Sequence, residues 1–503
     1  MLFLGAGLCL LTVVLSTFAL AAGAHVLVTW LSGGAFLVYL GLMFPRVSRT
    51  TRVLLLIATL LGIVGFATGG MTTSAFREAL GTSAFMGALF TCFGTLRDAA
   101  SSSLLMQRAG TFLASRPPGQ RYGALSAGSH LFGLILNFST ISLLGTLVHE
   151  GTRAADGDPN DERTRKAAFL RRHMAQAIHR GFSTTTIWCP LTICIAVIFT
   201  ALPETTWVRT LPWLLGVTAT FLLSGWLLDR LSHRTPAGAN GSGSGTGASN
   251  GNGNVSGLDT GTPGETPGSW WLLLAIVGLV VVIFSSGWFV EEMLDVRLVL
   301  GVMIVCPFFA LGWILIQGVP ARGLSGALSE TGRRAEHHLR NAFPKYANEL
   351  GIIGGSTLIA LVTAAALPDT WVPAVIHWLD LPPWVLIAAV PWLAILLGQV
   401  GMSPLLSVAL IASTMPTPAH LGLNPETMAV AYAGAWSLVT STSPYTAALL
   451  LSSGLASTRS TTVTPFQFGP IANGPYTLVN LLALDGLIAF MELSGVLSGA
   501  PAA

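Results

Sequence analysis

Charge is what this 503-residue chain has least of. Asp, Glu, Lys and Arg make up only 9% of the residues, and hydrophobic residues make up 52%. A soluble chain of ordinary composition carries roughly a quarter charged residues. The scarcity of charge excludes a water-soluble globular protein and predicts an all-α polytopic membrane protein, whose length is used on membrane-spanning helices.

Motifs of several functional classes are also missing. The five cysteines lie in apolar segments and show neither metal-ligand spacing nor a disulfide framework: Cys9, Cys92, Cys189, Cys194 and Cys306. The chain has no Walker A sequence and no closely spaced His and acidic ligands of a zinc-dependent membrane enzyme. A net charge of +3 gives no argument for nucleic acid. We therefore expect no enzyme, no catalytic residues, no cofactor, no resident metal and no nucleic-acid partner.

Apolar runs of about 20 residues, the length that crosses a bilayer, follow one another along the chain. The N-terminus has no basic region and no clear cleavage site, so we expect its apolar run to be the first span and not a removed signal peptide. Nine unbroken spans are expected at 2–22, 26–44, 53–69, 82–96, 207–228, 270–290, 297–318, 347–366 and 475–496.

One hydroxyl-rich stretch inside an apolar segment occurs twice. Gly181–Pro190 contains Ser183, Thr184 and Thr185, and a shift of 254 residues brings Ser183 onto Ser437 and Pro190 onto Pro444. The second copy holds Thr440, Ser441, Thr442 and Ser443. Since a proline removes a helix hydrogen bond, we expect two broken helices, at 161–202 and 425–452, which bring the number of spans to about eleven.

Two further apolar segments are interrupted in the middle. Residues 122–148 are interrupted at Asn137-Phe-Ser139-Thr140, and residues 384–413 at Gly398 to Pro404, which includes Ser403. Each arm of the first has about 14 residues, roughly 20 Å of helix, which is too short to cross a bilayer. We predict two re-entrant hairpins; the alternative for the first is one ordinary span with a polar patch.

A segment without large side chains divides the chain. Residues 235–269 are mostly Gly, Ser, Asn, Thr and Pro and cannot bury enough apolar area to fold. We expect a first repeat half at 1–228, a flexible cytoplasmic linker at 229–269, and a second repeat half at 270–503.

Basic residues predict the orientation. If the N-terminus is cytoplasmic and both interrupted segments are hairpins, nearly all Arg and Lys lie inside, and the outside loops hold few, namely Arg77, Arg209 and Arg297. A full span in place of either hairpin would remove this bias. The first hairpin then enters from inside and the second from outside, which is an inverted-topology repeat.

Eleven spans, two opposed hairpins and two broken helices resemble the ion transporter superfamily, with the closest layout in the divalent anion/sodium symporter family. That family carries a Ser-Asn-Thr signature at its hairpin tips, whereas the tips here read Asn137-Phe-Ser-Thr140 and Gly401-Met-Ser-Pro404. The resemblance implies a scaffold part, a transport part that moves as a rigid body (an elevator mechanism), and a homodimer formed through the scaffold.

The broken helices and hairpin tips form the candidate site. Freed helix N-termini favour an anion, and freed carbonyls and C-termini favour a cation. We expect binding of a substrate and a coupling ion, sodium or a proton, by Asn137, Ser139, Thr140, Ser183, Thr184, Thr185, Ser403, Thr440, Ser441, Thr442 and Ser443. The alternative is that these Ser and Thr only hydrogen-bond between packed helices.

Three charged or titratable positions have two interpretations each. The basic cluster of Arg171, Arg172, His173 and Arg180 either anchors a cytoplasmic helix or attracts an anion, and Arg180, at the break, is the better candidate for the anion. Asp485, in the middle of the last span, either couples transport to protons or pairs with a polar group of the scaffold. His130 is expected to be a hydrogen-bonded packing residue, and the alternative is a histidine that titrates near neutral pH.

Together these features predict a multi-pass secondary active transporter, a symporter of a small anion such as a carboxylate, in the lipid bilayer of a bacterial inner membrane. The alternative is a cation/proton antiporter or an exporter on the same scaffold. A cation antiporter usually needs buried carboxylates, and the few acidic residues in the spans favour an anion.

Overall fold

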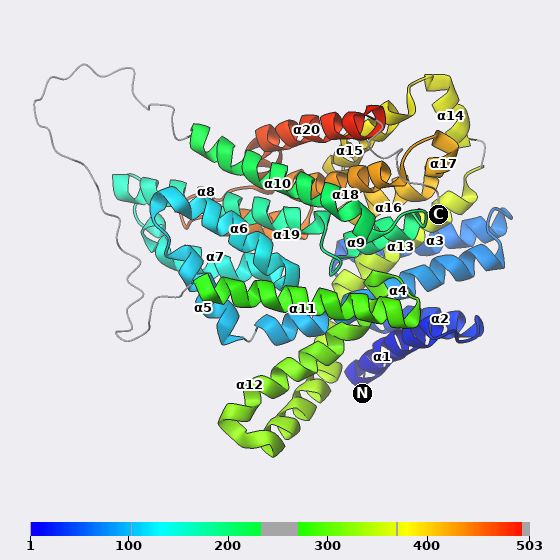
Figure 1. The fold of residues 1–503 in the computed structure, drawn as a ribbon, viewed down its shortest axis with the longest axis horizontal. Helices are drawn as coiled ribbons and strands as arrows, with labels where there is room; N and C mark the ends of the chain where they lie inside the picture. Colours follow the sequence, from blue (N-terminus) through cyan, green and yellow to red (C-terminus); the bar gives the residue numbers. More distant parts are fainter. Residues whose placement is uncertain (1, 102, 233–269, 369–370, 495–503) are drawn as a thin grey trace, which may run out of the picture.

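The computed structural model describes residues 2–101, 103–232, 270–368 and 371–494, and within these ranges the regular structure is helical (Figure 1). The expected linker at 229–269 lies, from residue 233 on, outside the described residues. The helices before it are α1 (Leu2–Ala21), α2 (Leu27–Met43), α3 (Arg49–Ala67), α4 (Thr73–Ser101), α5 (Leu104–Ala114), α6 (Pro118–Leu136), α7 (Ser139–Gly151), α8 (Glu162–Ser183), α9 (Ile193–Ala201) and α10 (Trp207–Ser232). Those after it are α11 (Trp270–Leu294), α12 (Leu298–His337), α13 (Ala347–Ala366), α14 (Trp371–Leu379), α15 (Pro383–Gln399), α16 (Pro404–Thr414), α17 (Pro418–Leu421), α18 (Pro425–Thr442), α19 (Ala447–Ala456) and α20 (Gly474–Leu493).

The chain is an all-α polytopic membrane protein. In the part that the structure describes, nine helical segments are long and apolar enough to cross a membrane, and each overlaps one of the nine unbroken spans expected from the sequence. The other two expected spans correspond to the interrupted helices α8/α9 and α18/α19, whose pieces are too short or too polar to be counted alone.

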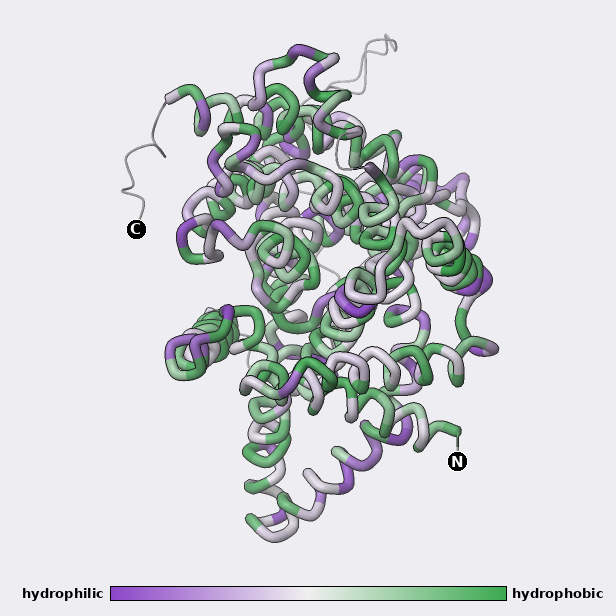
Figure 2. Tube along the Cα trace, turned by 90° about the vertical axis from the view of Figure 1, so that its right-hand side faces the viewer, coloured by the Kyte–Doolittle hydropathy of each residue, from purple (hydrophilic) through white to green (hydrophobic). Residues whose placement is uncertain are grey.

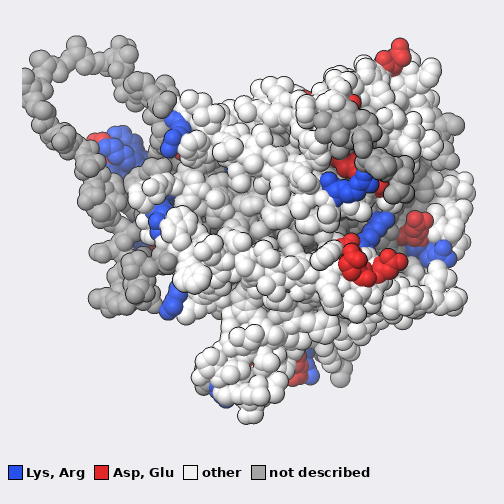
Figure 3. Space-filling model, in the orientation of Figure 1, with Lys and Arg blue, Asp and Glu red and all other residues white. Residues whose placement is uncertain are grey.

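Side-chain polarity follows the same pattern. On the face shown in Figure 3, charged side chains gather toward the two ends of the long axis and on the part that projects at the bottom, and the broad band between them shows almost none. Helices α10 and α11 run along that axis (Figure 1). Large apolar side chains such as Leu56, Leu60 and Ile63 of α3 are exposed. An outer band of this kind is what the hydrocarbon core of a bilayer requires.

Both hydroxyl-rich stretches lie where a helix is interrupted. Helix α8 ends at Ser183, a short 3₁₀ turn η3 follows (Thr184–Ile187), and Pro190 lies in the irregular backbone before α9. Helix α18 ends at Thr442, and Ser443 is extended (φ −67°, ψ 123°) before Pro444. Neither proline can donate a helix hydrogen bond, so the helix cannot pass through these positions unchanged.

Two helix pairs double back at tight turns. Helices α6 and α7 pack against each other across Asn137 and Phe138, where Asn137 takes the left-handed region (φ 51°). Helices α15 and α16 pack against each other across residues 400–403, where Gly401 has φ 103°. Positive φ at one residue reverses the chain within a few positions, and asparagine and glycine are among the residues that adopt it most readily.

A short helix from each half of the chain, before and after the segment 233–269, packs against helices of the other half. Helix α9 packs on α16 and α18, and in the matching arrangement α19 packs on α7 and α8. Around them, α3 packs on α13 while α4 packs on α12. Each interrupted helix therefore ends in a short piece that is held by the other half of the chain.

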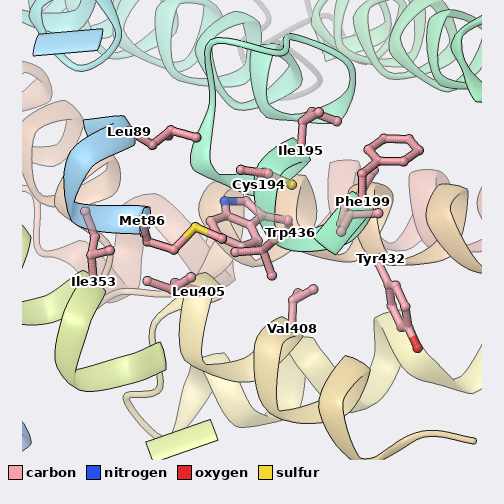
Figure 4. Packing of buried hydrophobic residues seen from close by; sticks show 14 of the residues in the cluster. Met86, Leu89, Cys194, Ile195, Phe199, Ile353, Leu405, Val408, Tyr432 and Trp436 are labelled. Atoms are coloured by element: carbon pink, nitrogen blue, oxygen red, sulfur yellow. The ribbon is translucent and has the colours of Figure 1, made fainter. Parts of the chain in front are cut away.

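Apolar side chains fill the junction between these helices. Figure 4 shows Cys194, Ile195 and Phe199 of α9 in one cluster with side chains of four other helices. The other labelled members are Met86 and Leu89 of α4, Ile353 of α13, Leu405 and Val408 of α16, and Tyr432 and Trp436 of α18. All ten are buried, so this cluster fixes the position of α9 and α18 next to the breaks.

The basic residues between the expected spans 297–318 and 347–366 predict a loop there, and this prediction is wrong. Helix α12 continues to His337, with a reversal at Gly323 (φ 66°), and its two arms project from the body (Figure 1). The arm after the reversal is rich in hydrophilic residues (Figure 2). Its charged residues form a helix because Glu330 pairs with Arg333 and Arg334, three and four positions on.

Replacing Gly181 with alanine tests the close approach of α8 and α6. A Cβ at this position would stand 2.0 Å from the carbonyl oxygen of Ser126. The atoms that the new Cβ would meet belong to the backbone of Ser126 and cannot move aside easily. We therefore expect Gly181→Ala to destabilise the protein by about 1–3 kcal/mol. Gly216→Ala, in α10 with nothing within 4 Å, is the control and should be neutral or slightly stabilising. Equal melting temperatures for the two variants would contradict the described packing.

Candidate functional site

The two interrupted helices cross at equivalent residues. The Ser437 hydroxyl donates a hydrogen bond to the backbone carbonyl of Ser183 at 2.9 Å. These are the two serines that the 254-residue shift superposes. Both are buried, with 1% or less of their surface exposed. The contact brings the two hydroxyl-rich breaks into one region of the molecule.

The first break is held by hydroxyls that bond back to the preceding turn. Ser183, Thr184 and Thr185 donate to the carbonyls of residues 180, 181 and 182 at 2.7–2.9 Å. The Thr184 hydroxyl, whose proton is used in this way, also lies 2.8 Å from His130 Nδ1. His130 Nε2 accepts from the indole N–H of Trp188 at 3.2 Å. His130 therefore carries its proton on Nδ1 and is neutral, a hydrogen-bonded packing residue at the break.

The second break is held by hydrogen bonds to α8, α15 and α20. The carbonyl of Ser441 accepts from His179 Nε2 at 3.3 Å and from Asn473 Nδ2 at 3.0 Å. The Ser443 hydroxyl donates to the Gly398 carbonyl of α15 at 2.7 Å. The hydroxyls of Thr442 in α18 and Thr477 in α20 form a hydrogen bond with each other. Thr440 donates to the carbonyl four residues before it in its own helix, at 2.8 Å.

Arg180 is the charge at the centre of this region. Its side chain is buried, with 7% of the residue exposed, and it donates to Asn473 Oδ1 at 2.8 Å and to the Tyr122 hydroxyl at 3.2 Å. The Ala472 carbonyl lies at 3.4 Å, and the Tyr476 ring centroid at 4.9 Å. All these partners are neutral, and within the described ranges no carboxylate pairs with Arg180. A buried cation is normally paired with a carboxylate, and Arg180 lacks such a partner within the described residues.

Unsatisfied polar atoms lie at the same places. The Tyr476 hydroxyl is fully buried beside Arg180 and has no hydrogen-bond partner. The Thr140 hydroxyl, at the start of α7, and Gln399 Nε2, at the end of α15, are also buried without a partner. Each such atom costs about 1–3 kcal/mol, so water, an ion or a ligand is expected to complete it.

The remaining hairpin residues have separate places. Asn137 lines a cavity of about 20 Å³, room for about one water molecule, together with Arg97 and Leu191. Ser139 is the first residue of α7. Ser403 caps α16 by accepting from the Leu406 N–H at 3.1 Å, which is a structural role. The structure thus brings the broken-helix residues together with Arg180, while the hairpin tips border this group.

Two of the four residues of the basic cluster on α8, Arg171 and His173, are paired with carboxylates. Arg171 has no exposed surface, pairs with Asp156 at 2.9 Å, and also donates to the Thr152 and Ser457 carbonyls at 2.7 and 3.2 Å. His173 lies 3.2 Å from Asp229. Arg171 therefore ties the segment before α8 to the loop after α19.

Asp485 lies apart from the breaks. Its Oδ2 accepts from the Trp392 indole N–H of α15 at 3.0 Å, and its Oδ1 is buried without a partner. Among the described residues, none of the hydroxyls of the two breaks contacts it. Asp485 thus pairs with a polar group of the second hairpin, and it makes no hydrogen bond to Arg180.

Sequence reasoning missed the residues that hold Arg180. Asn473, Tyr476 and Asn480 stand three and four positions apart and lie buried on one face of α20. That polar spacing on an otherwise apolar span was visible in the sequence. Tyr122 and its contact with Arg180 had no comparable signal.

No group of three or more His, Cys, Asp or Glu residues in the described ranges could hold a metal ion. This agrees with the donor chemistry of the breaks, which offer hydroxyls, amides and carbonyls.

Comparison with known proteins assigns no family. No family model matches the sequence, and no curated protein is significantly similar to it. Among solved structures, the crystal structure of the Alcanivorax borkumensis YdaH transporter is similar, with a TM-score of 0.45 and 15% identity. The match covers 90% of this chain and 97% of that chain. A similarity of this degree assigns neither a family nor an activity to the chain.

The pair of Arg171 and Asp156 predicts a pH dependence. Hydrogen bonds from Arg171 hold the pKa of Asp156 below its usual value. Because the pKa of Asp156 is lower in the folded than in the unfolded protein, ionised Asp156 stabilises the folded state above about pH 4. This stabilisation is lost as the pH falls from there through the folded-state pKa. We expect Asp156→Asn to cost about 1–3 kcal/mol at pH 7 and to flatten the acid limb of the melting temperature.

The control is Asp158→Asn, the same change at an exposed position of the same loop. If both variants kept the full acid limb, Asp156 would not be the group that titrates.

Proposed function

We propose that this chain is a secondary active transporter, not an enzyme, that moves a small anion such as a carboxylate across the bacterial inner membrane. The observation that carries the proposal is Arg180, a buried guanidinium at a helix break with only neutral partners. A transporter must bind its substrate at membrane depth, between broken helices.

The chemistry around Arg180 suits an oxyanion. A guanidinium has five N–H donors, and the contacts to Asn473, Tyr122 and Ala472 use three of them. Two donors and the unpartnered Tyr476 hydroxyl remain for carboxylate or similar oxygens. At about 4 Å and an effective dielectric constant near 20, one opposite charge is worth roughly 4 kcal/mol. That is enough to offset much of the cost of taking the anion out of water.

The same accounting disfavours a cation/proton antiporter. Such a protein needs a buried carboxylate on the ion path. In the described ranges, carboxylates next to the interrupted helices already have polar partners: Glu426 accepts from Thr205, Asp156 from Arg171 and Glu492 from Asn424, and Asp229 lies beside His173. Sodium or protons remain the proposed coupling ions, with the freed carbonyls at the breaks as sodium ligands.

An elevator mechanism is part of the proposal. The hairpins pack on the interrupted helices of their own half, α6 on α8 and α15 on α18, and each short piece packs on the other half. These contacts support a transport part that moves as one body within an inverted repeat, against a scaffold of α1 to α4 and α11 to α13. We propose that the scaffold also forms a homodimer.

Replacing Arg180 tests the anion site. Detergent-purified protein is melted with mono-, di- and tricarboxylates, sulfate and phosphate, in sodium and in potassium, at two pH values. A ligand at 100 times its Kd stabilises the folded state by about 2.7 kcal/mol. We expect one anion class to raise the melting temperature and Arg180→Gln to abolish the shift.

Arg165→Gln is the matched control, since it removes the same charge from an exposed position of the same helix. Without anion, Arg180→Gln should melt at or above the wild-type temperature, because it removes an unpaired buried charge. An anion shift that survives in Arg180→Gln would refute this site. A shift that depends on the cation alone would favour the antiporter.

Cysteine labelling tests the proposed orientation, with a cytoplasmic N-terminus. Four of the five native cysteines are buried and Cys9 is partly buried, so background labelling is low. A membrane-impermeant maleimide on intact cells should label Glu204→Cys and spare Asn160→Cys, both at exposed loop positions. Permeabilised cells should label both. The reverse pattern in intact cells would overturn the orientation.

A further inference from the structure

A large cavity lies away from the helix breaks, between α1, α4 and α12. Its volume is about 890 Å³, at the upper end of the roughly 300–1,000 Å³ that encloses a drug-sized molecule. It is bounded on one side by the projecting arms of α12 (Figure 1). The residues at the breaks do not line it, so it is separate from the anion site at Arg180.

The cavity has an apolar part and a basic part. Leu11 of α1 and Pro307, Leu311 and Ile314 of α12 belong to helical segments that are apolar enough to span the membrane. Farther along the chain, Arg334, His337 and Lys345 line it after α12 has reversed its direction. The cavity therefore runs from hydrocarbon-facing helix to the charged end of the scaffold.

Positive charge is in excess around the basic part. Two acids, Asp98 and Glu336, also line the cavity, and each is paired with an arginine just outside its lining, Arg97 at 3.4 Å and Arg340 at 2.8 Å. Glu330 nearby pairs with Arg322, Arg333 and Arg334 at 2.8–3.6 Å. Lys345 is exposed and has no ion pair among the described residues. Its ammonium is therefore unmatched.

The second arm of α12 has the character of a helix at a membrane surface. Leu324 and Leu328 are 62% and 54% exposed on an arm that also carries Arg333 and Arg334. A helix with exposed leucines and arginines lies in the interface between lipid headgroups and acyl chains. This places the basic part of the cavity at headgroup level.

We propose that this cavity binds an anionic phospholipid, with its acyl chains along α1 and α12 and its phosphate at Lys345. A soluble anion would leave the apolar wall uncovered, and a zwitterionic lipid would leave the excess positive charge unmatched. Basic pockets between spanning helices at the cytoplasmic side are known to suit anionic headgroups.

The test uses the full-length protein, delipidated in a neutral detergent. Its melting temperature is followed while phosphatidylglycerol, phosphatidylcholine or free glycerol phosphate is added at equal concentrations. Phosphatidylglycerol should raise the melting temperature, and the other two should have little effect. Lys345→Gln should weaken the apparent affinity for phosphatidylglycerol about fivefold, the share of one basic residue.

Lys166→Gln is the matched control, since Lys166 is the other lysine of the chain and lies exposed on α8. Ala335→Trp fills the cavity from an exposed position and should also weaken the lipid effect, so the test does not depend on one variant. Equal effects of phosphatidylcholine, equal effects of free glycerol phosphate, or an unchanged affinity in both cavity variants would overturn the proposal. If the melting temperature rose with protein concentration and not with added lipid, the cavity would be occupied by a second copy of the chain, and this result would also overturn the proposal.

Discussion

A helix that is broken inside a membrane frees carbonyl and amide groups, and water is not there to satisfy them. Much of this structure depends on meeting that constraint. The carbonyl of Ser183 is satisfied by Ser437, that of Ser441 by His179 and Asn473, and that of Trp188 by the indole of Trp207. These donors come from other helices. The breaks therefore exist only when the surrounding helices are assembled, which couples the irregular backbone to the tertiary structure.

The two hydroxyl-rich breaks differ in chemistry. The 254-residue shift places Arg180 over Gly434, and these two positions have different neighbours. A Cβ at Gly434 would meet Leu484 of α20 at 2.5 Å, so this position serves close helix packing. Arg180 meets the other end of the same helix, at Asn473 and Tyr476. Helix α20 thus packs on Gly434 of α18 through an apolar side chain and offers polar partners to Arg180 of α8 at its other end. The two stretches thus share their place at a helix break, and Arg180 gives the first a charge that Gly434 does not give the second.

The sequence predicted the helical class and the nine unbroken spans, because a span of about 20 apolar residues is a local property. It also marked the hydroxyl-rich stretches at the breaks, because proline and hydroxyls act on the backbone next to them. It failed at α12, where charge was taken as a sign of a loop and i to i+4 pairs instead made a helix. It also failed to find Asn473 and Tyr122 as partners of Arg180. They are separated from it by 293 and 58 residues, and only the packing of α6, α8 and α20 brings them together.

The packing also indicates what has to move together. If one interrupted helix moved alone, the Ser183 carbonyl would lose Ser437, and the Ser441 carbonyl would lose His179, each in a place without water. Each loss leaves a buried polar group unpaired, at about 1–3 kcal/mol. Helices α13 and α16 meet largely through apolar side chains, with Leu358 and Ile359 against Leu406, and through one long hydrogen bond from the Ser413 hydroxyl to the Ala360 carbonyl at 3.4 Å. Apolar contacts have no fixed direction and re-form after a shift along the helix. The two interrupted helices are therefore tied to each other by polar contacts that a displacement of one helix alone would break.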